Sequence, residues 1–210
     1  MKKKAAVIGV LIFLGVAGFL AYRYLSVDTP PQPLPSQEAQ RIFDACKDIS
    51  GDQTAHEKCT ARQFADAGEQ QGISFIGEVL TAYQTLDVGY QGYQNCHVLA
   101  HRISNDLASR KPGAWKELIQ QLDAGALNPT SCGGGFMHGA LEVRAGEDPD
   151  FKVNASLFQE LCSETLKKEL SSSCAHILGH LALVEAYGKR EDALKACGGL
   201  SGDFLFQCYG

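Results

Sequence analysis

The segment CGGGFMHGALE, residues 132–142, places a histidine and a glutamate four residues apart, behind a cysteine and three glycines. Residues i and i+4 of a helix lie on one face, so His138 and Glu142 would point in the same direction. The same spacing occurs in two other segments that begin with a cysteine: CHVLAH, residues 96–101, with His97 and His101, and CAHILGH, residues 174–180, with His176 and His180. Five of the six histidines therefore lie in three short, similar segments.

The cysteines of these segments belong to a longer repeat. Taking Cys59, Cys96, Cys132, Cys174 and Cys208 as equivalent gives steps of 37, 36, 42 and 34 residues, in the range of helix-turn-helix repeat units. Three of these cysteines follow another cysteine after 13, 12 or 11 residues. Eight cysteines allow many pairings. The spacing favours Cys46–Cys59, Cys162–Cys174 and Cys197–Cys208, which leaves Cys96 to pair with Cys132.

Apolar residues recur every three or four positions through most of the chain, as in AQRIFDAC, AWKELIQQL and REDALKAC. This period is typical of amphipathic helices, and the alternation of β-branched residues that marks strands is nearly absent. We therefore predict an all-α domain over residues 38–210, built as an array of disulfide-stapled helical hairpins of the α-solenoid type. A hydrophobic content of 45% in 210 residues is enough for a real core.

The first 23 residues, MKKKAAVIGVLIFLGVAGFLAYR, combine three lysines, an uncharged apolar run and an arginine. The run is about long enough to cross a bilayer, and the lysines favour a cytoplasmic N-terminus. We predict a signal anchor, or transmembrane helix, over residues 1–25 and a proline-rich linker over residues 26–37. A cleaved signal peptide is the competing interpretation, although no clear A-x-A site follows the run.

Either interpretation exports the domain. The protein would be a single-pass protein of the cell membrane with its C-terminal domain outside the cytoplasm, which is the periplasm in a Gram-negative cell. An even number of cysteines agrees with an oxidising compartment. Without the four basic residues near the N-terminus, 15 basic residues face 24 acidic ones, a net charge of −9. This balance argues against nucleic acid as a partner.

The stretch CAHILGHLALVEAYGKREDALKAC, its ending ALKAC and the cysteine-linked hairpins resemble cysteine-rich tetratricopeptide-like repeat proteins. The resemblance covers residues 46–210. It implies a right-handed superhelix of helical hairpins with one row of helices lining a concave face. It implies no catalytic residue.

The clustered histidines suggest a metal site. The candidate ligands are imidazoles and one carboxylate: His97, His101, His138, Glu142, His176 and His180. Such a donor set suits a transition metal, namely zinc, copper or iron. A haem held noncovalently by two histidines is the alternative cofactor. Neither H-E-x-x-H nor C-x-x-C-H occurs, so a zinc-peptidase motif and covalent haem attachment are not indicated.

Convergence of these residues requires unusually close helices. With ordinary spacing, the two outer helices of three would lie roughly 16–20 Å apart, too far for one ion. Glycines let backbones approach closely, and the chain has them at positions 133–135, 139 and 179. Two adjacent ions would also solve the problem. Candidates for outer contacts to the ligands are Asn105, Asp106, Glu185 and Arg102, whereas His56 is predicted to be a surface residue.

Two functions remain open at this stage. In the first, the histidines form a metalloenzyme centre or a metal-handling site, with Glu142 as a ligand or general base. In the second, the helical array is an interaction scaffold, or an accessory subunit of a larger envelope complex, and the histidine pairs are structural or contact a partner. Membrane contact would be made through the N-terminal helix in both cases.

Overall fold

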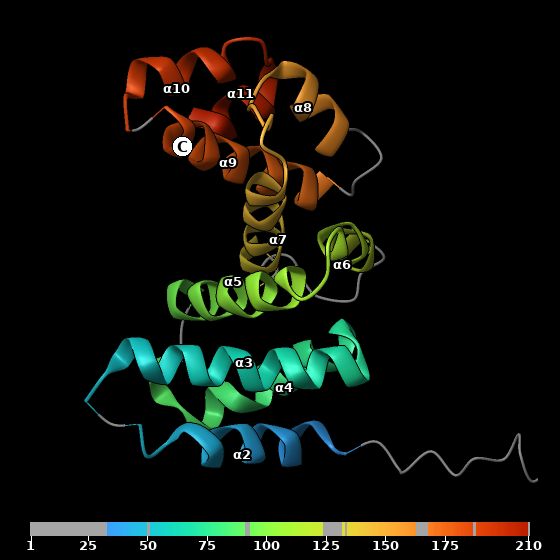
Figure 1. Ribbon diagram of the computed structural model, residues 1–210, viewed down its shortest axis with the longest axis vertical. Coiled ribbons are helices and arrows are strands. Elements are labelled where there is room, and N and C mark those ends of the chain that lie inside the picture. Colours follow the sequence, from blue (N-terminus) through green and yellow to red (C-terminus); the bar gives the residue numbers. More distant parts are fainter. Residues whose placement is uncertain are drawn as a thin grey trace, which may run out of the picture. The chain divides into compact units, whose positions relative to one another are not determined.

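Helices are the only regular secondary structure in the part of the chain that the structure describes (Figure 1). The computed structural model describes residues 33–49, 51–90, 93–123, 132, 134–162, 168–186 and 188–209. The elements, in order, are α2 (Pro35–Cys46), α3 (Gln53–Gln71), α4 (Ile73–Leu86), a 3-10 helix (Val88–Tyr90), α5 (Tyr93–Ser109), α6 (Ala114–Asp123), α7 (Gly134–Glu147), α8 (Ala155–Leu161), α9 (Lys168–Glu185), α10 (Arg190–Cys197) and α11 (Gly202–Tyr209). The all-α prediction is therefore confirmed for these residues.

Local sequence signals account for several helix boundaries. The backbone N–H of Ala55 donates to the side chain of Asp52, which caps α3, and Asn154 caps α8 in the same way through Leu157 N–H. Gly72, at φ 89°, separates α3 from α4 in a conformation that other residues rarely adopt. Pro35 opens α2, because a helix needs no N–H donor in its first turn. Helix α2 therefore begins at Pro35, within the linker predicted for residues 26–37.

The predicted anchor at residues 1–25 lies outside the described residues. Among the helices that the structure does describe, none combines the length and the apolar character needed to cross a bilayer. The described helices belong to one compact unit, Leu34–Gly210.

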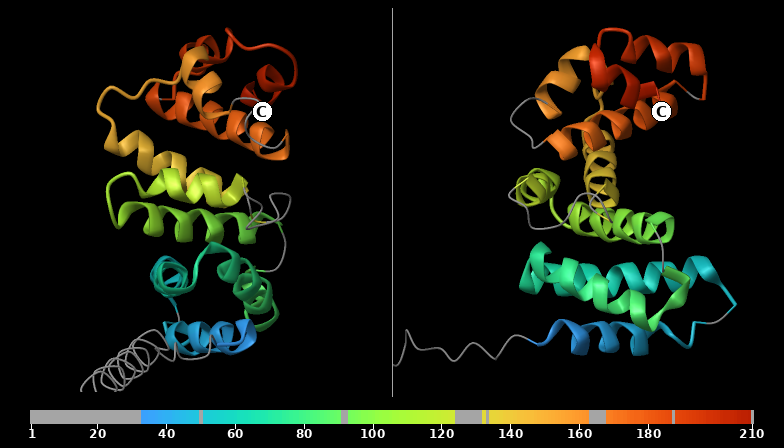
Figure 2. Two further views of the ribbon diagram at one scale, coloured as in Figure 1. Left: turned by 90° about the vertical axis from the view of Figure 1, so that its right-hand side faces the viewer. Right: turned by 180° about the vertical axis from the view of Figure 1, so that it is seen from behind.

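The three histidine-bearing helices are neighbours in this unit. Helix α7 lies between α5 and α9 and contacts both of them (Figures 1 and 2). Helix α3 packs on α5, and α11 packs on α9. The arrangement with α7 in the middle is the one that a common metal site requires, because α7 carries His138 and Glu142.

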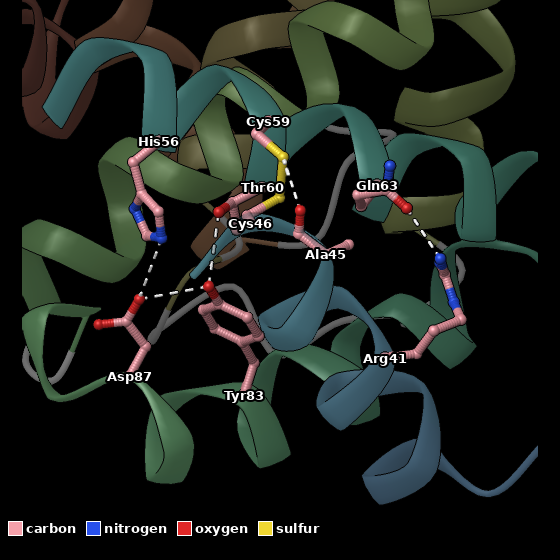
Figure 3. Close-up of a disulfide and its surroundings, with 9 residues drawn as sticks. All are labelled: Arg41, Ala45, Cys46, His56, Cys59, Thr60, Gln63, Tyr83 and Asp87. Carbon is pink, nitrogen blue, oxygen red and sulfur yellow. Dashed lines mark hydrogen bonds and ion pairs between the residues drawn. A yellow bond between two sulfur atoms is a disulfide. The ribbon is translucent and has the colours of Figure 1, made fainter. Parts of the chain in front are cut away.

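Disulfides join neighbouring helices at four places. The pairs are Cys46–Cys59, Cys96–Cys132, Cys162–Cys174 and Cys197–Cys208, with Cα–Cα distances of 5.9, 5.4, 5.5 and 5.8 Å. These are the pairs that the cysteine spacing favours. Figure 3 shows the first of them, between the end of α2 and α3, beside the buried Tyr83. Each crosslink reduces the conformational freedom of the unfolded chain and so stabilises the fold.

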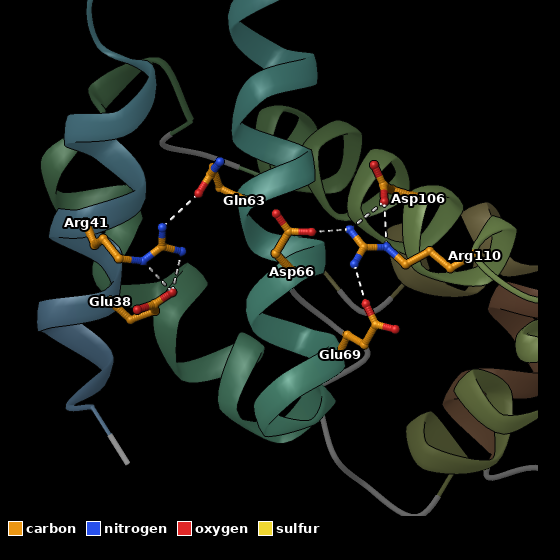
Figure 4. Close-up of polar contacts among 7 residues, drawn as sticks. All are labelled: Glu38, Arg41, Gln63, Asp66, Glu69, Asp106 and Arg110. Carbon is orange, nitrogen blue, oxygen red and sulfur yellow. Dashed lines mark hydrogen bonds and ion pairs between the residues drawn. The ribbon is translucent and has the colours of Figure 1, made fainter. Parts of the chain in front are cut away.

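Ion pairs hold α5 against α3, and a hydrogen bond from an arginine joins α2 to α3 (Figure 4). Arg110 of α5 pairs with Asp66 and Glu69 of α3 and with Asp106 of its own helix, at 2.6–2.9 Å. Arg41 of α2 pairs with Glu38 and donates to Gln63 of α3. An isolated surface pair contributes little, but a network around one partly buried guanidinium fixes the position of α5 more firmly.

Two glycines one turn apart let α7 lie directly against the backbone of α5. A Cβ atom at Gly135 would collide with the carbonyl oxygen of His97 and lie 2.9 Å from the Cβ of Ala100. A Cβ atom at Gly139 would collide with the carbonyl oxygen of His101 and lie 2.7 Å from the backbone nitrogen of Asn105. No side chain larger than hydrogen fits at either position unless the helices separate.

The facing surface of α5 is made of small residues as well. Ala100 and Ser104, four residues apart, are fully buried and lie opposite the two glycines. The hydroxyl of Ser104 donates a hydrogen bond to the carbonyl oxygen of Phe136. This bond joins the two helices inside their contact. The predicted close packing by glycine is therefore present between α5 and α7. Gly179 differs from that prediction, because it lies against the backbone of Cys208 in α11 and not against α7.

Substitution of Gly139 by alanine tests this contact. Because the obstructing atoms are backbone atoms, Gly139→Ala should lower the free energy of unfolding by about 2 kcal/mol or more, measured by urea denaturation. Gly146→Ala in the same helix is the control, since a Cβ there has no neighbour within 4 Å. Alanine is the better helix former, so the control should raise the free energy of unfolding by up to about 1 kcal/mol. Equal effects of the two substitutions would contradict the close contact.

Candidate metal centre

The five histidines of the three similar segments form one continuous cluster. The ring centroids of His101 and His138 lie 4.4 Å apart with the rings nearly parallel, and those of His97 and His138 lie 5.9 Å apart. On the other side, the His138 centroid lies 5.4 Å from that of His180, which in turn lies 4.4 Å from that of His176. Helices α5, α7 and α9 therefore each bring imidazoles to the same place, with His138 in the middle.

Glu142 joins two of these imidazoles into a group suited to a metal ion. Its Oε2 lies 2.8 Å from Nε2 of His101, and its Oε1 lies 3.5 Å from Nε2 of His138. One donor atom from each of the three residues lies within 4.8 Å of the others. A zinc ion binds nitrogen and oxygen at about 2.0–2.2 Å, so ligand atoms around it lie some 3–3.5 Å apart. Small side-chain rotations would bring this group to that geometry.

The group is half-buried, and burial and hydrogen bonding together set its protonation. Burial lowers the pKa of His138 from 6.5 to about 4, with a further contribution from the neighbouring imidazoles. The hydrogen bond with His101 lowers the pKa of Glu142, outweighing the opposing effect of burial. At neutral pH the group therefore presents a neutral imidazole at His138 and an ionised carboxylate at Glu142, which are the forms that bind metal ions.

Two more histidines of the cluster, His97 and His180, share this environment. Burial is the main cause that lowers the pKa of His97 and of His180, and nearby imidazoles add to it in both cases. For His97, the imidazoles that help to lower the pKa include His101 of its own helix and His176 and His180 of α9.

Outer contacts around the group agree only in part with the sequence prediction. Asn105 lies beside the site, with its Nδ2 3.5 Å from Oε2 of Glu142. The other three candidates interact elsewhere. Arg102 pairs with Glu57, Asp106 pairs with Arg110, and Glu185 accepts from the backbone of Val153. Sequence separation alone could not distinguish these cases, because it does not give the rotation of each helix.

His56 lies apart from the cluster, as predicted, but it is not a plain surface residue. Its side chain is only 20% exposed, and its Nε2 lies 3.9 Å from Oδ2 of Asp87. Asp87 also accepts from the hydroxyl of Tyr83, so His56 belongs to the polar network beside the Cys46–Cys59 disulfide (Figure 3).

An open groove of about 920 Å³ borders the metal-binding group. Its walls come from α3 and α5, and both His101 and Glu142 line it. Lys58 and Arg62, four residues apart on α3, also line the groove. The sequence analysis did not identify these two residues, because a lone basic pair on a helix gives no signal of a cavity. The groove means that an ion held by His101 and Glu142 could be reached by a small molecule.

Comparison of the chain with protein-family models, with curated proteins and with solved structures gives no significant match. The function must therefore be argued from the geometry of this chain.

The pKa of His138 predicts how stability depends on pH. Because the folded-state pKa lies below the unfolded value of 6.5, the unfolded chain takes up a proton first as the pH falls. The contribution of His138 to the free energy of unfolding should be fully present above pH 6.5. It should be lost progressively down to about pH 4, by up to about 3 kcal/mol. The measurement is urea denaturation of the metal-free protein across this range. His138→Gln should reduce the dependence and leave the parts due to His97 and His180, whose pKa values are also lowered. His56→Gln, outside the cluster, should leave the dependence unchanged, and an equal reduction by both substitutions would contradict the assignment.

Proposed function

We propose that this domain binds a transition metal ion through His101, His138 and Glu142 and uses it as a catalytic centre open to the groove between α3 and α5. The observation that carries the proposal is the meeting of three donor atoms within 4.8 Å, from two helices fixed in contact by Gly135 and Gly139. Carboxylate clusters on surfaces are common, but two partly buried imidazoles with one carboxylate form a recognised ligand combination.

The donor set favours iron or zinc. Two histidines and one carboxylate bind iron(II) in oxygenases and zinc in several hydrolases, and both kinds of centre keep open coordination positions. Copper remains compatible with the imidazoles, but the carboxylate favours the other two metals. A haem held between His101 and His138 is disfavoured, because these rings stack at 4.4 Å and leave no space for a macrocycle between them.

In such a centre the metal ion would activate a bound water or dioxygen molecule. Side chains of the protein would bind and position this ion. His101 and His138 hold the ion, Glu142 contributes charge and Asn105 orients its carboxylate. The groove admits the substrate on the side where His101 and Glu142 are accessible. This access favours catalysis over storage of the metal, which requires no room for a second molecule.

The charges of the groove favour an anionic substrate. Arg102 and Arg110 line it but are paired with carboxylates. Lys58 and Arg62 line it too, and no ion pair joins either of them to a carboxylate of the described residues. A local positive charge in an otherwise acidic domain would raise the concentration of anions at the metal.

The setting of this function is part of the proposal. Four disulfides suit an oxidising compartment outside the cytoplasm. The proposal also includes three features that the sequence suggests: a membrane anchor at residues 1–25, a solenoid-type order of the helical hairpins, and membership of a larger envelope complex. The anchor would keep the metal centre near the membrane surface.

An interaction scaffold is the second candidate, and exposed apolar side chains favour it. Helices α9 and α11, which pack on each other, expose Val184 at 73% and Phe206 at 75%. Large exposed apolar side chains are a feature of protein interfaces. A protein that binds no metal would make this the leading interpretation. A partner could also dock there while the metal centre works.

Metal analysis of the full-length protein, purified without a histidine tag, tests the leading proposal. After exposure to zinc or to iron(II) without oxygen, the protein should retain metal, and His101→Ala/His138→Ala should bind it at least about 100-fold more weakly, because two ligands of this group are lost. Glu142→Gln keeps the shape of the side chain and should weaken binding about 10–100-fold through loss of charge.

The matched control for these variants is His56→Ala, which removes the histidine outside the cluster. It should bind metal as the wild type does. Wild-type affinity in the His101→Ala/His138→Ala variant, with the fold intact by circular dichroism, would contradict the proposed ligands.

A further inference from the structure

The groove beside the metal-binding group is walled by helices that carry different kinds of side chain. Helices α3 and α5 pack together, and the groove of about 920 Å³ lies along them. His101 of α5 and Glu142 of α7 line it, as do Lys58 and Arg62 of α3. Its volume is in the range of sites that bind small molecules. A molecule in the groove would therefore meet the metal-binding group and two basic side chains together.

Both carboxylates among the described lining residues are already engaged. Asp106 pairs with Arg110, which also binds two carboxylates of α3, all at 2.6–2.9 Å (Figure 4). Glu142 is hydrogen-bonded to His101 and would bind the ion in the proposed centre. The lining therefore offers no spare carboxylate to the basic residues of α3.

Lys58 and Arg62 keep their positive charges uncompensated. Both residues are exposed, and within the described ranges no ion pair joins either of them to a carboxylate. Glu57, next to Lys58 in sequence, pairs with Arg102 instead, at 2.8 Å. Residues four apart lie on one face of a helix, about 6 Å apart along its axis, so the two positive charges repel each other. An anion that contacts both side chains would remove this repulsion.

Two ion pairs fix the register of α3 against α5. Glu57 meets Arg102, and nine residues further along the chain Asp66 meets Arg110, which directly follows α5. Nine residues of one helix rise about 13.5 Å and eight residues of the other rise about 12 Å, so the partners advance together. Helices α3 and α5 therefore run in the same direction (Figure 1), and heights on one can be matched with heights on the other.

This register places Lys58 beside the metal-binding group and Arg62 one turn beyond it. Lys58 follows Glu57 and His101 precedes Arg102, so Lys58 and His101 differ in height along the helices by only about 3 Å. Arg62 lies about 6 Å further on. The axes of packed helices are about 8–10 Å apart, so an anion held on the α3 wall lies across the groove from an ion held by α5 and α7.

We propose that Lys58 and Arg62 bind the oxyanion group of a small organic substrate, a carboxylate or a phosphate, while another part of that molecule contacts the metal ion. This inference rests on the proposed function, because it assigns the substrate class of that centre. A guanidinium donates two parallel N–H bonds to a carboxylate or phosphate, and an ammonium adds a compact charge. The oxyanion holds the substrate and is not the group that reacts, because it lies on the opposite wall from the ion.

Binding of inorganic phosphate to the full-length protein without metal tests this subsite. At about pH 8 most of the phosphate carries two charges, and isothermal titration calorimetry measures its affinity. Lys58→Met/Arg62→Gln should bind phosphate at least about tenfold more weakly, because charge-assisted hydrogen bonds are lost. Both residues are exposed, so this variant should fold normally, as circular dichroism would show.

The matched control is Lys189→Met/Arg190→Gln, which removes the same charge from exposed residues outside the groove. It should bind phosphate as the wild type does. Equal losses in the two variants would mean attraction by net charge alone and would overturn the inference, as would a wild type that binds no phosphate. Acetate, titrated in parallel, separates the two kinds of oxyanion: the tighter ligand identifies whether the subsite suits a phosphate ester or a carboxylic acid.

Zinc gives a readout that separates this inference from the proposed function. Lys58→Met/Arg62→Gln should bind zinc as the wild type does, because neither residue is a ligand. With zinc bound, the tenfold difference in phosphate affinity should persist, because the subsite lies across the groove from the ion. Loss of that difference would mean that phosphate binds the ion itself; the subsite would then be wrong and the metal centre would stand. A protein that binds phosphate through these residues but retains no zinc would refute the metal centre, and with it the role of the oxyanion in holding a substrate there.

Discussion

The contact between the backbones of α5 and α7 is the constraint on which the rest of the site depends. Helices that pack through ordinary side chains keep their axes about 8–10 Å apart. Gly135 and Gly139 remove the side chains on one helix, and Ala100 and Ser104 reduce them on the other. The closer approach brings Nε2 of His101 to within 2.8 Å of Glu142. Without it, the histidines of α5 and the carboxylate of α7 would face each other across a gap too wide for one ion.

One disulfide adjoins this arrangement directly, and another crosslinks helices that pack on α9. The Cys96–Cys132 bond joins the first turn of α5 to the residue two positions before α7, so it lies close to His97 and Gly135 in the chain. The Cys197–Cys208 bond ties α10 to α11, and the Gln207 carbonyl oxygen of α11 lies 3.3 Å from Nδ1 of His176 in α9. A site built on covalently connected helices loses little conformational entropy on binding a ligand, because its donor atoms are already near their final positions.

Much of the fold followed from local patterns in the sequence. Apolar periodicity gave the helices, and cysteine separations of 11–13 residues indicated which neighbours are crosslinked, because a hairpin of two short helices returns the chain after about that length. The i,i+4 spacing also identified His138 and Glu142 as residues of one helix face. These features depend on a few consecutive residues, so tertiary packing changes them little.

Features that depend on helix rotation could not be predicted. The sequence did not reveal that His101, rather than His97, contacts Glu142. It also did not reveal that Gly179 packs against α11 and not against α7. Only the crossing of packed helices decides these contacts. The groove is a similar case, because Lys58 and Arg62 come to border the metal-binding group through the packing of α3 on α5. His56 was misjudged for the same reason: Asp87, its neighbour in space, is distant in sequence.

Anomalous diffraction from a crystal of the protein grown with zinc tests the central claim most directly. Data collected on both sides of the zinc absorption edge locate the ion without any assumption about its ligands. The account predicts an anomalous peak between α5 and α7, within bonding distance of His101, His138 and Glu142, about 2.0–2.2 Å from each donor atom. Zinc bound only at surface carboxylates, with these three side chains still hydrogen-bonded to one another, would contradict it.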